Sequence, residues 1–141
     1  MIVLDTNVVS ELMRREPEDA VVRWVAAQPA PSLYVTSIAQ AEILHGIALL
    51  PAGRRRTAIQ EAADAMFAVD FRERILPFDS GAARAYADVA AKRRRAGRPI
   101  SHFDAQIAAI ALSAGAAMAT RNVADFEGCG LRLVNPWSAR G

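Results

Sequence analysis

The feature that most constrains the fold is the alternation of short apolar runs with longer segments of helical periodicity. The intervals between the runs are far longer than a β-hairpin needs, so helices are expected to join the strands and make them parallel. The sequence therefore predicts an α/β/α sandwich whose short, mostly parallel central sheet is flanked by helices. The expected strands are residues 2–4, 33–35, 75–76, 116–120 and 131–134.

Composition limits the class of protein. A length of 141 residues predicts one domain spanning residues 1–141, and a hydrophobic share of 52% excludes a disordered chain. The formal charge of +2 gives no overall attraction to nucleic acid. Cys129 is the single cysteine, which excludes an internal disulfide and favours a reducing cytoplasm. We expect neither a signal peptide nor a membrane span, because the first apolar run stops at Asp5 and no longer run approaches about 18 residues.

Four acids lie where the predicted strands end or where the next helices begin. Asp5 follows the first strand, Glu42 lies early in the helix after the second strand, Asp104 opens a later helix, and Asp125 follows the strand at residues 116–120. Ligands of open parallel sheets bind at the carboxyl ends of the strands, so we expect these acids to converge there.

Clustered carboxylates repel one another unless a cation neutralises them. Oxygen ligands favour a hard ion, so the expected cofactor is Mg²⁺ or Mn²⁺. Such an ion binds phosphate oxygens and activates water, and phosphodiester hydrolysis is the chemistry that this set of residues favours.

Each acid also has a purely structural interpretation. Asp5 is a suitable helix cap, and Asp104 has capping-box spacing from Ser101, as Gln40 has from Ser37. Glu42 is alternatively a glutamate on the protein surface, and Asp125 is alternatively a turn residue, because it lies in a turn-like segment. Spacing alone leaves the metal site and these structural roles open.

Three blocks of sequence resemble the PIN domain, and more narrowly the VapC/FitB toxin branch of type II toxin–antitoxin systems. They are residues 2–11 (IVLDTNVVSE), residues 36–43 (TSIAQAEI) and residues 104–109 (DAQIAA). Residues 75–79 and the closing segment 135–137 are similar to the FitB-like group. The resemblance covers essentially the whole chain in the same order.

The resemblance implies a PIN-like fold and a metal-dependent endoribonuclease. It places Asp5, Glu42 and Asp104 at metal-binding and catalytic positions. Many PIN domains carry the fourth acid where this chain has Asn122, so Asp125 is left with three open roles: a ligand, a group acting through water, or no ligand at all. The candidate donors that orient carboxylates or water are Thr6, Asn7, Ser37, Thr120 and Asn122.

The resemblance also implies partners. Toxins of this branch are inhibited by a small antitoxin, commonly dimerise, and contact operator DNA only through the antitoxin. We therefore expect a cognate antitoxin, an RNA substrate, a homodimer and no membrane. The alternative is a non-catalytic PIN-like module that binds RNA or an antitoxin and represses its operon.

Two basic runs are candidate contacts for RNA phosphates. The competing interpretation of both runs is a solvated surface, and the second lies at a helix C-terminus, where cations complement the helix dipole. The candidate RNA-binding residues are Arg54, Arg55, Arg56, Arg93, Arg94 and Arg95.

Overall fold

The computed structural model describes residues 1–138 and contains a parallel sheet with the strand order β3-β2-β1-β4-β5. Every strand pair is parallel, which confirms the predicted α/β architecture. In β1, Val3 pairs with Tyr34 on one side and with Met118 on the other. The strands are β1 (Ile2–Leu4), β2 (Leu33–Thr36), β3 (Ile75–Leu76), β4 (Ala117–Ala119) and β5 (Leu133–Val134).

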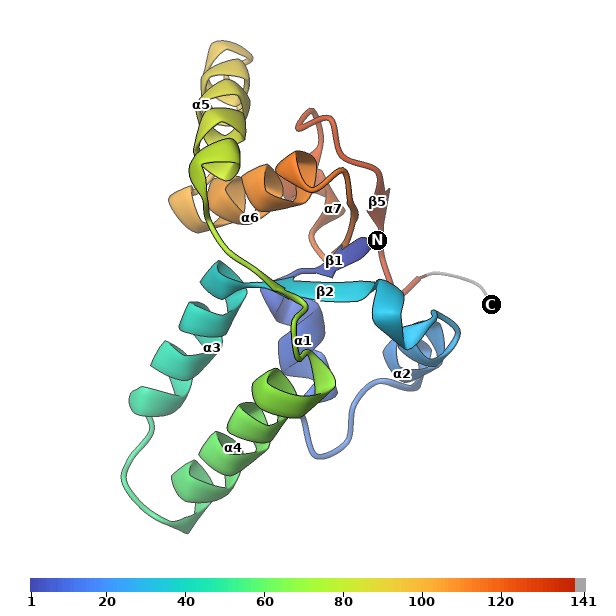
Figure 1. The fold of residues 1–141 in the computed structure, drawn as a ribbon, viewed down its shortest axis with the longest axis vertical. Coiled ribbons are helices and arrows are strands. Elements are labelled where there is room, and N and C mark those ends of the chain that lie inside the picture. Colours follow the sequence, from blue (N-terminus) through green and yellow to red (C-terminus); the bar gives the residue numbers. More distant parts are fainter. Residues whose placement is uncertain (139–141) are drawn as a thin grey trace.

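Helices cover both faces of the sheet (Figure 1). One face carries α1 (Thr6–Leu12), α2 (Asp19–Ala26) and α4 (Arg54–Ala65), which continues into a π-helical turn at Met66–Asp70. The other carries α5 (Ser80–Arg95), α6 (His102–Ser113) and α7 (Val123–Phe126). Helix α3 (Ser37–Ala48) contributes to both layers, and a 3₁₀ turn at Ala30–Ser32 precedes β2.

Alternation along β1 separates two hydrophobic cores. Leu4 packs among α1, α2 and the end of α4, whereas Val3 packs among α5, α6 and α7. Both side chains are fully buried because successive residues of a strand point to opposite faces, and both faces of this sheet are covered. None of the described helices is long and apolar enough to cross a bilayer.

Side-chain caps set where several helices begin. Asp79 accepts a hydrogen bond from the backbone N–H of Ala82 at 2.9 Å at the start of α5. The prediction that Ser37 caps the helix after β2 is wrong, because Thr36 accepts from the Ala39 N–H at 3.0 Å and Ser37 is the first helical residue. The hydroxyl one residue earlier is the one positioned to reach the third amide of the helix.

Candidate functional site

A cavity of about 480 Å³ lies at the carboxyl ends of β1 and β4. The chain runs from β1 outward to β2 and β3, then returns to place β4 on the other side of β1. Ligands of open α/β sheets bind at such a reversal of strand order. The lining includes three of the four acids singled out from the sequence, namely Asp5, Glu42 and Asp104.

Asp5 is the most buried of these acids, with 4% of its surface exposed. Its Oδ1 accepts from the Thr6 N–H, and its Oδ2 accepts from the Thr120 hydroxyl, both at 2.8 Å. Burial raises the pKa of Asp5 to about 6, against the opposing effect of these two hydrogen bonds, and the charges of Asp104 and Glu42 raise it further. The cavity therefore makes ionisation of Asp5 costly.

Glu42 and Asp104 reach the cavity from two different helices. Glu42 lies in the second turn of α3, and its Oε1 accepts from the Thr6 hydroxyl at 2.8 Å. Asp104 lies in the first turn of α6, where its backbone N–H donates to the Ser101 hydroxyl at 3.2 Å. Partial burial raises the pKa of Asp104, the Ser101 contact opposes that rise, and the charge of Asp125 adds to it.

Asp125 is placed apart from the other three acids. It is exposed in the short helix α7 and does not line the cavity, although its charge acts on Asp104. Within residues 1–138, no three His, Cys, Asp or Glu side chains are grouped closely enough to hold one metal ion together. The four acids therefore do not surround a single point in the described structure.

The predicted donors divide between the cavity and its surroundings. Thr6, Asn7 and Asn122 line the cavity, and Thr120 lies beneath it, fully buried. The Thr120 hydroxyl accepts from the Asn7 side-chain amide at 3.4 Å and from the Asn122 N–H at 3.1 Å. Ser37 does not line the cavity.

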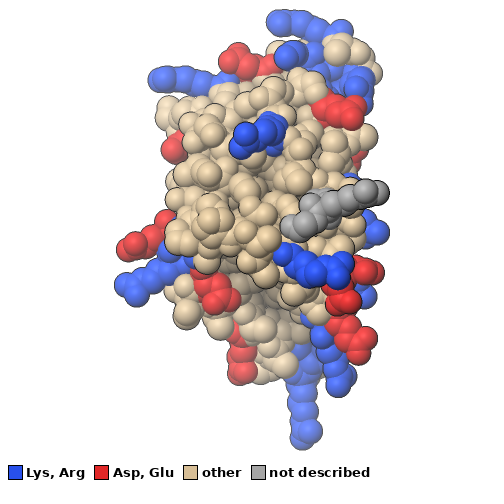
Figure 2. All heavy atoms as spheres, turned by 90° about the vertical axis from the view of Figure 1, so that its right-hand side faces the viewer, with Lys and Arg blue, Asp and Glu red and all other residues tan. Residues whose placement is uncertain are grey.

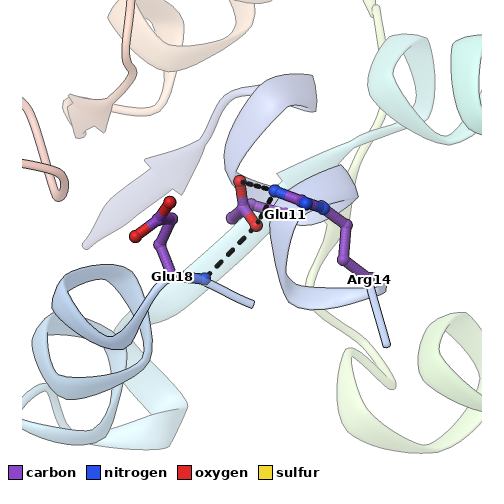
Figure 3. Close-up of polar contacts among 3 residues, drawn as sticks. All are labelled: Glu11, Arg14 and Glu18. Carbon is purple, nitrogen blue, oxygen red and sulfur yellow. Dashed lines mark hydrogen bonds and ion pairs between the residues drawn. The ribbon is translucent and has the colours of Figure 1, made fainter. Parts of the chain in front are cut away.

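Glu11 and Arg14 also line the cavity, and the sequence analysis did not identify them. The Glu11 carboxylate, 6% exposed, accepts from Arg14 Nη1 at 3.0 and 3.2 Å and from the Glu18 N–H at 3.4 Å (Figure 3). The guanidinium compensates the buried carboxylate, and the Glu18 N–H contact to that carboxylate fixes the connection from α1 to α2. An offset of four residues from Asn7 was the available signal for Glu11, because it places both residues on the same face of α1. Arg14 lies beyond the end of α1, so helical periodicity does not mark it.

Arg121 and Trp137 also line the cavity and were likewise missed as site residues. The Arg121 guanidinium carbon lies over the Trp137 ring, 5.1 Å from its centroid. Arg121 follows β4 and Trp137 follows β5, so the pair depends on the neighbouring alignment of these strands. No local sequence pattern marks such a contact between two turns.

The two basic runs lie far from each other. Arg54–56 begin α4 and Arg93–95 end α5, at opposite ends of the long axis (Figure 1). Figure 2 shows basic side chains at both ends of one face and further ones, mixed with acidic side chains, around its edges. Arg93 is 6% exposed and donates to the carbonyls of Arg98 and Glu127, so its guanidinium is committed to the fold. Arg54, Arg55, Arg94 and Arg95 are exposed.

Comparisons with known proteins agree with this architecture. The family model described as PIN domain matches residues 2–127. VapC ribonuclease Y4jK of Sinorhizobium fredii is 44% identical over 137 residues, which cover 97% of this chain and 98% of that protein. Toxin FitB of Neisseria gonorrhoeae is 35% identical over 137 residues, covering 97% of this chain and 99% of that protein.

A solved structure has nearly the same fold. The structure of FitAB bound to an IR36 DNA fragment contains a chain that matches with a TM-score of 0.93 at 34% identity. The match covers 100% of this chain and 99% of that chain.

Proposed function

Since this chain belongs to the PIN-domain family, we propose that it is a divalent-metal-dependent endoribonuclease and the toxin of a toxin–antitoxin pair. The observation that carries the proposal is the meeting of Asp5, Glu42 and Asp104 at one cavity, located where the strand order reverses. The names of the two relatives, a VapC ribonuclease and a toxin, support the same activity.

The carboxylates fit Mg²⁺ or Mn²⁺ in the chemistry of their donors. Mg²⁺ keeps several waters and is commonly held by one or two carboxylates, so it needs no cage of three or four. Each Asp5 oxygen accepts one hydrogen bond, which leaves each with further acceptor capacity. We assign Asp5 and Asp104 as the ligands that bind the ion directly and Glu42 as an acid that acts through one of the ion's waters, because no three acids among residues 1–138 are grouped around one point. Asp125 is assigned no direct bond to the ion, because it lies outside the cavity lining.

The protein groups have distinct roles in this proposal. A bound ion would lower the pKa of an attacking water and stabilise the leaving oxygen of the phosphodiester. Thr120 and Thr6 fix the orientation of Asp5, and the Thr6 hydroxyl also fixes that of Glu42. Asn7 and Asn122 hold the Thr120 hydroxyl in place and border the substrate.

The proposed partners follow from the relatives. FitAB is a complex bound to DNA, and its matching chain has 34% identity to this one. We therefore assign to this chain a cognate antitoxin, contact with operator DNA through that antitoxin, and a homodimeric assembly. Its site of action is the cytoplasm, where its RNA substrate resides.

The test is RNA cleavage by the purified chain freed of any co-purifying antitoxin. A panel of structured and unstructured RNAs is incubated with Mg²⁺, with Mn²⁺ and with EDTA. The proposal expects endonucleolytic products that require the ion and disappear when antitoxin is added back. If no RNA is cut with either ion while the RNA is still bound, the non-catalytic binding module replaces the nuclease.

A further inference from the structure

Arg121 is a cation that lines the carboxylate cavity and has no acidic partner among residues 1–138. It differs in this respect from Arg14, the other arginine of the lining, whose guanidinium is bound to Glu11. Arg121 is exposed, so its N–H donors are accessible to a ligand. An exposed and unpaired guanidinium beside a candidate catalytic cavity is available to an anionic substrate.

The backbone that carries Arg121 is held from two directions. Its N–H donates to Asn7 Oδ1 at 3.3 Å, and its carbonyl accepts from Asn135 Nδ2 at 3.4 Å. The other side-chain atom of Asn135, Oδ1, accepts from the Trp137 N–H at 2.9 Å. Asn135 thus fixes Arg121 and Trp137 relative to each other, and Asn7 ties both to the start of α1, next to Asp5.

Trp137 limits the positions open to the guanidinium. The indole packs against the core layer formed around Leu4, and Arg121 lies over its ring. The indole N–H is buried without an acceptor among the described residues, so packing and the cation–π contact, rather than a hydrogen bond, position the ring. A guanidinium held over an aromatic ring loses less rotamer freedom when it binds a ligand.

We propose that Arg121, positioned by Trp137, binds a backbone phosphate of the RNA next to the scissile phosphodiester. This inference rests on the proposed nuclease function and names a substrate contact for the same cavity. The in-plane N–H groups of a guanidinium match two phosphate oxygens, and its free face can stack on a nucleobase. An acidic peptide would use only the first of these features, so a nucleotide fits the pair better.

The test is RNA binding in an Asp5→Asn background with Mg²⁺, which prevents cleavage during the measurement. Fluorescence anisotropy of a labelled 20-nucleotide mixed-sequence RNA is recorded over a range of salt concentrations. Arg121→Gln is expected to weaken binding about tenfold, the loss of one charge-assisted contact. It should also lower the slope of log K against log salt by about 0.7, the value for one phosphate contact on a single strand.

Matched variants separate charge from structure. Trp137→Leu should weaken binding while leaving the salt slope unchanged, because the charge remains and only its position is lost. Arg121→Lys should retain the salt slope with reduced affinity, because lysine cannot bind in the bidentate manner. Arg72→Gln removes the same charge from an exposed residue in the turn before β3, outside the cavity lining, and is the distal control that should alter neither quantity. Thermal melting of each variant verifies that it is folded.

Two outcomes would overturn the assignment while leaving the nuclease function standing. In the first, wild type cleaves RNA but Arg121→Gln keeps the parent's affinity and salt slope. In the second, Arg121→Gln weakens binding of a poly-glutamate peptide and not of RNA, which makes the ligand an acidic peptide. Absence of both binding and cleavage in the wild-type chain would instead contradict the proposed function itself.

Discussion

The Thr120 hydroxyl donates to Asp5 Oδ2 at 2.8 Å and so joins two residues that are 115 positions apart in the sequence. The same oxygen accepts from the Asn7 side chain and from the Asn122 backbone. A hydroxyl has one donor and two acceptor sites, so these three contacts use all of its capacity. Thr120 is fully buried, and its hydroxyl links the end of β4 to the end of β1 at the floor of the cavity.

Replacing Thr120 by valine should lower both stability and activity. The substitution keeps the shape but leaves Asp5 and Asn7 without their partner, which costs about 1–3 kcal/mol of unfolding free energy. Loss of the hydrogen bond that stabilises the Asp5 carboxylate should raise the pKa of Asp5 further and move the acid limb of the cleavage pH profile upward. Urea denaturation and a pH–rate profile measure the two effects.

Thr120→Ser is the control for that experiment, because it retains the hydroxyl and removes one methyl group. It should keep the pH profile of wild type. A Thr120→Val variant with wild-type stability and an unshifted profile would show that the hydroxyl does not support Asp5.

Asp5→Asn should abolish cleavage and yet stabilise the metal-free protein at neutral pH. The rise of the Asp5 pKa from 3.8 to about 6 corresponds to about 3 kcal/mol of unfolding free energy lost on ionisation. Asparagine carries no charge but forfeits one of the two hydrogen bonds, worth about 1 kcal/mol. The expected net gain in EDTA at pH 7.5 is about 1–2 kcal/mol by urea denaturation. An Asp5→Asn variant less stable than wild type would show that the ionised Asp5 carboxylate does not destabilise the metal-free protein.

The stability of the metal-free wild-type chain should fall as the pH rises from about 4 to about 6. In this window the folded state retains a proton on Asp5 that the unfolded chain, with a pKa of 3.8, has lost. The unfolding free energy decreases with pH wherever the folded state binds more protons. The raised pKa of Asp104 has an effect of the same sign.

Urea midpoints in EDTA at closely spaced pH values measure this trend, and Asp5→Asn is the matched control. The variant should show a smaller decrease over the same window. The contrary result is a wild-type stability that rises between pH 4 and pH 6 by more than that of Asp5→Asn. It would mean that the pKa of Asp5 is lower in the folded state than in the unfolded state, and that burial in the cavity does not raise it.

Mn²⁺ should raise the melting temperature of wild type and leave that of Asp104→Asn nearly unchanged. Binding to the folded state alone stabilises by about 3 kcal/mol when the ion is at 100 times its dissociation constant. Asp125→Asn is the discriminating control, because Asp125 lies outside the cavity lining and its loss should leave the Mn²⁺ shift intact. An unchanged shift in Asp104→Asn, or a shift abolished in Asp125→Asn, would require a different set of ligands.

Much of the fold follows from the periodicity of the sequence. The long intervals between apolar runs predicted parallel strands, and the structure confirms them. The strand order and register were not predictable from spacing, because they are decided by which faces of the helices pack together. Val3 and Leu4 each appear merely apolar in the sequence, yet they belong to two different cores.

Part of the candidate site was predictable from the positions of its residues relative to the strands. Residues immediately after parallel strands meet at one edge, so Asp5 could be placed from position alone. Asp125 could not, because its direction depends on the short helix α7. For Arg93, two sequence patterns disagree. The run of charges around it predicts an exposed side chain, but its offset of four residues from the buried Val89 places it on the inner face of α5, where the structure buries it. The roles of the site residues, the basic runs and the single-domain organisation stay predictions.

The most direct test of the central claim is single-turnover RNA cleavage by the antitoxin-free chain in Mn²⁺, compared among wild type, Asp5→Asn, Asp104→Asn and Asp125→Asn. The carboxylates at the reversal of strand order are proposed to hold the ion that performs the reaction. We expect cleavage by wild type, none by the Asp5 and Asp104 variants although both are folded, and retained cleavage by the Asp125 variant. Cleavage by Asp5→Asn or Asp104→Asn at the wild-type rate would contradict the central claim.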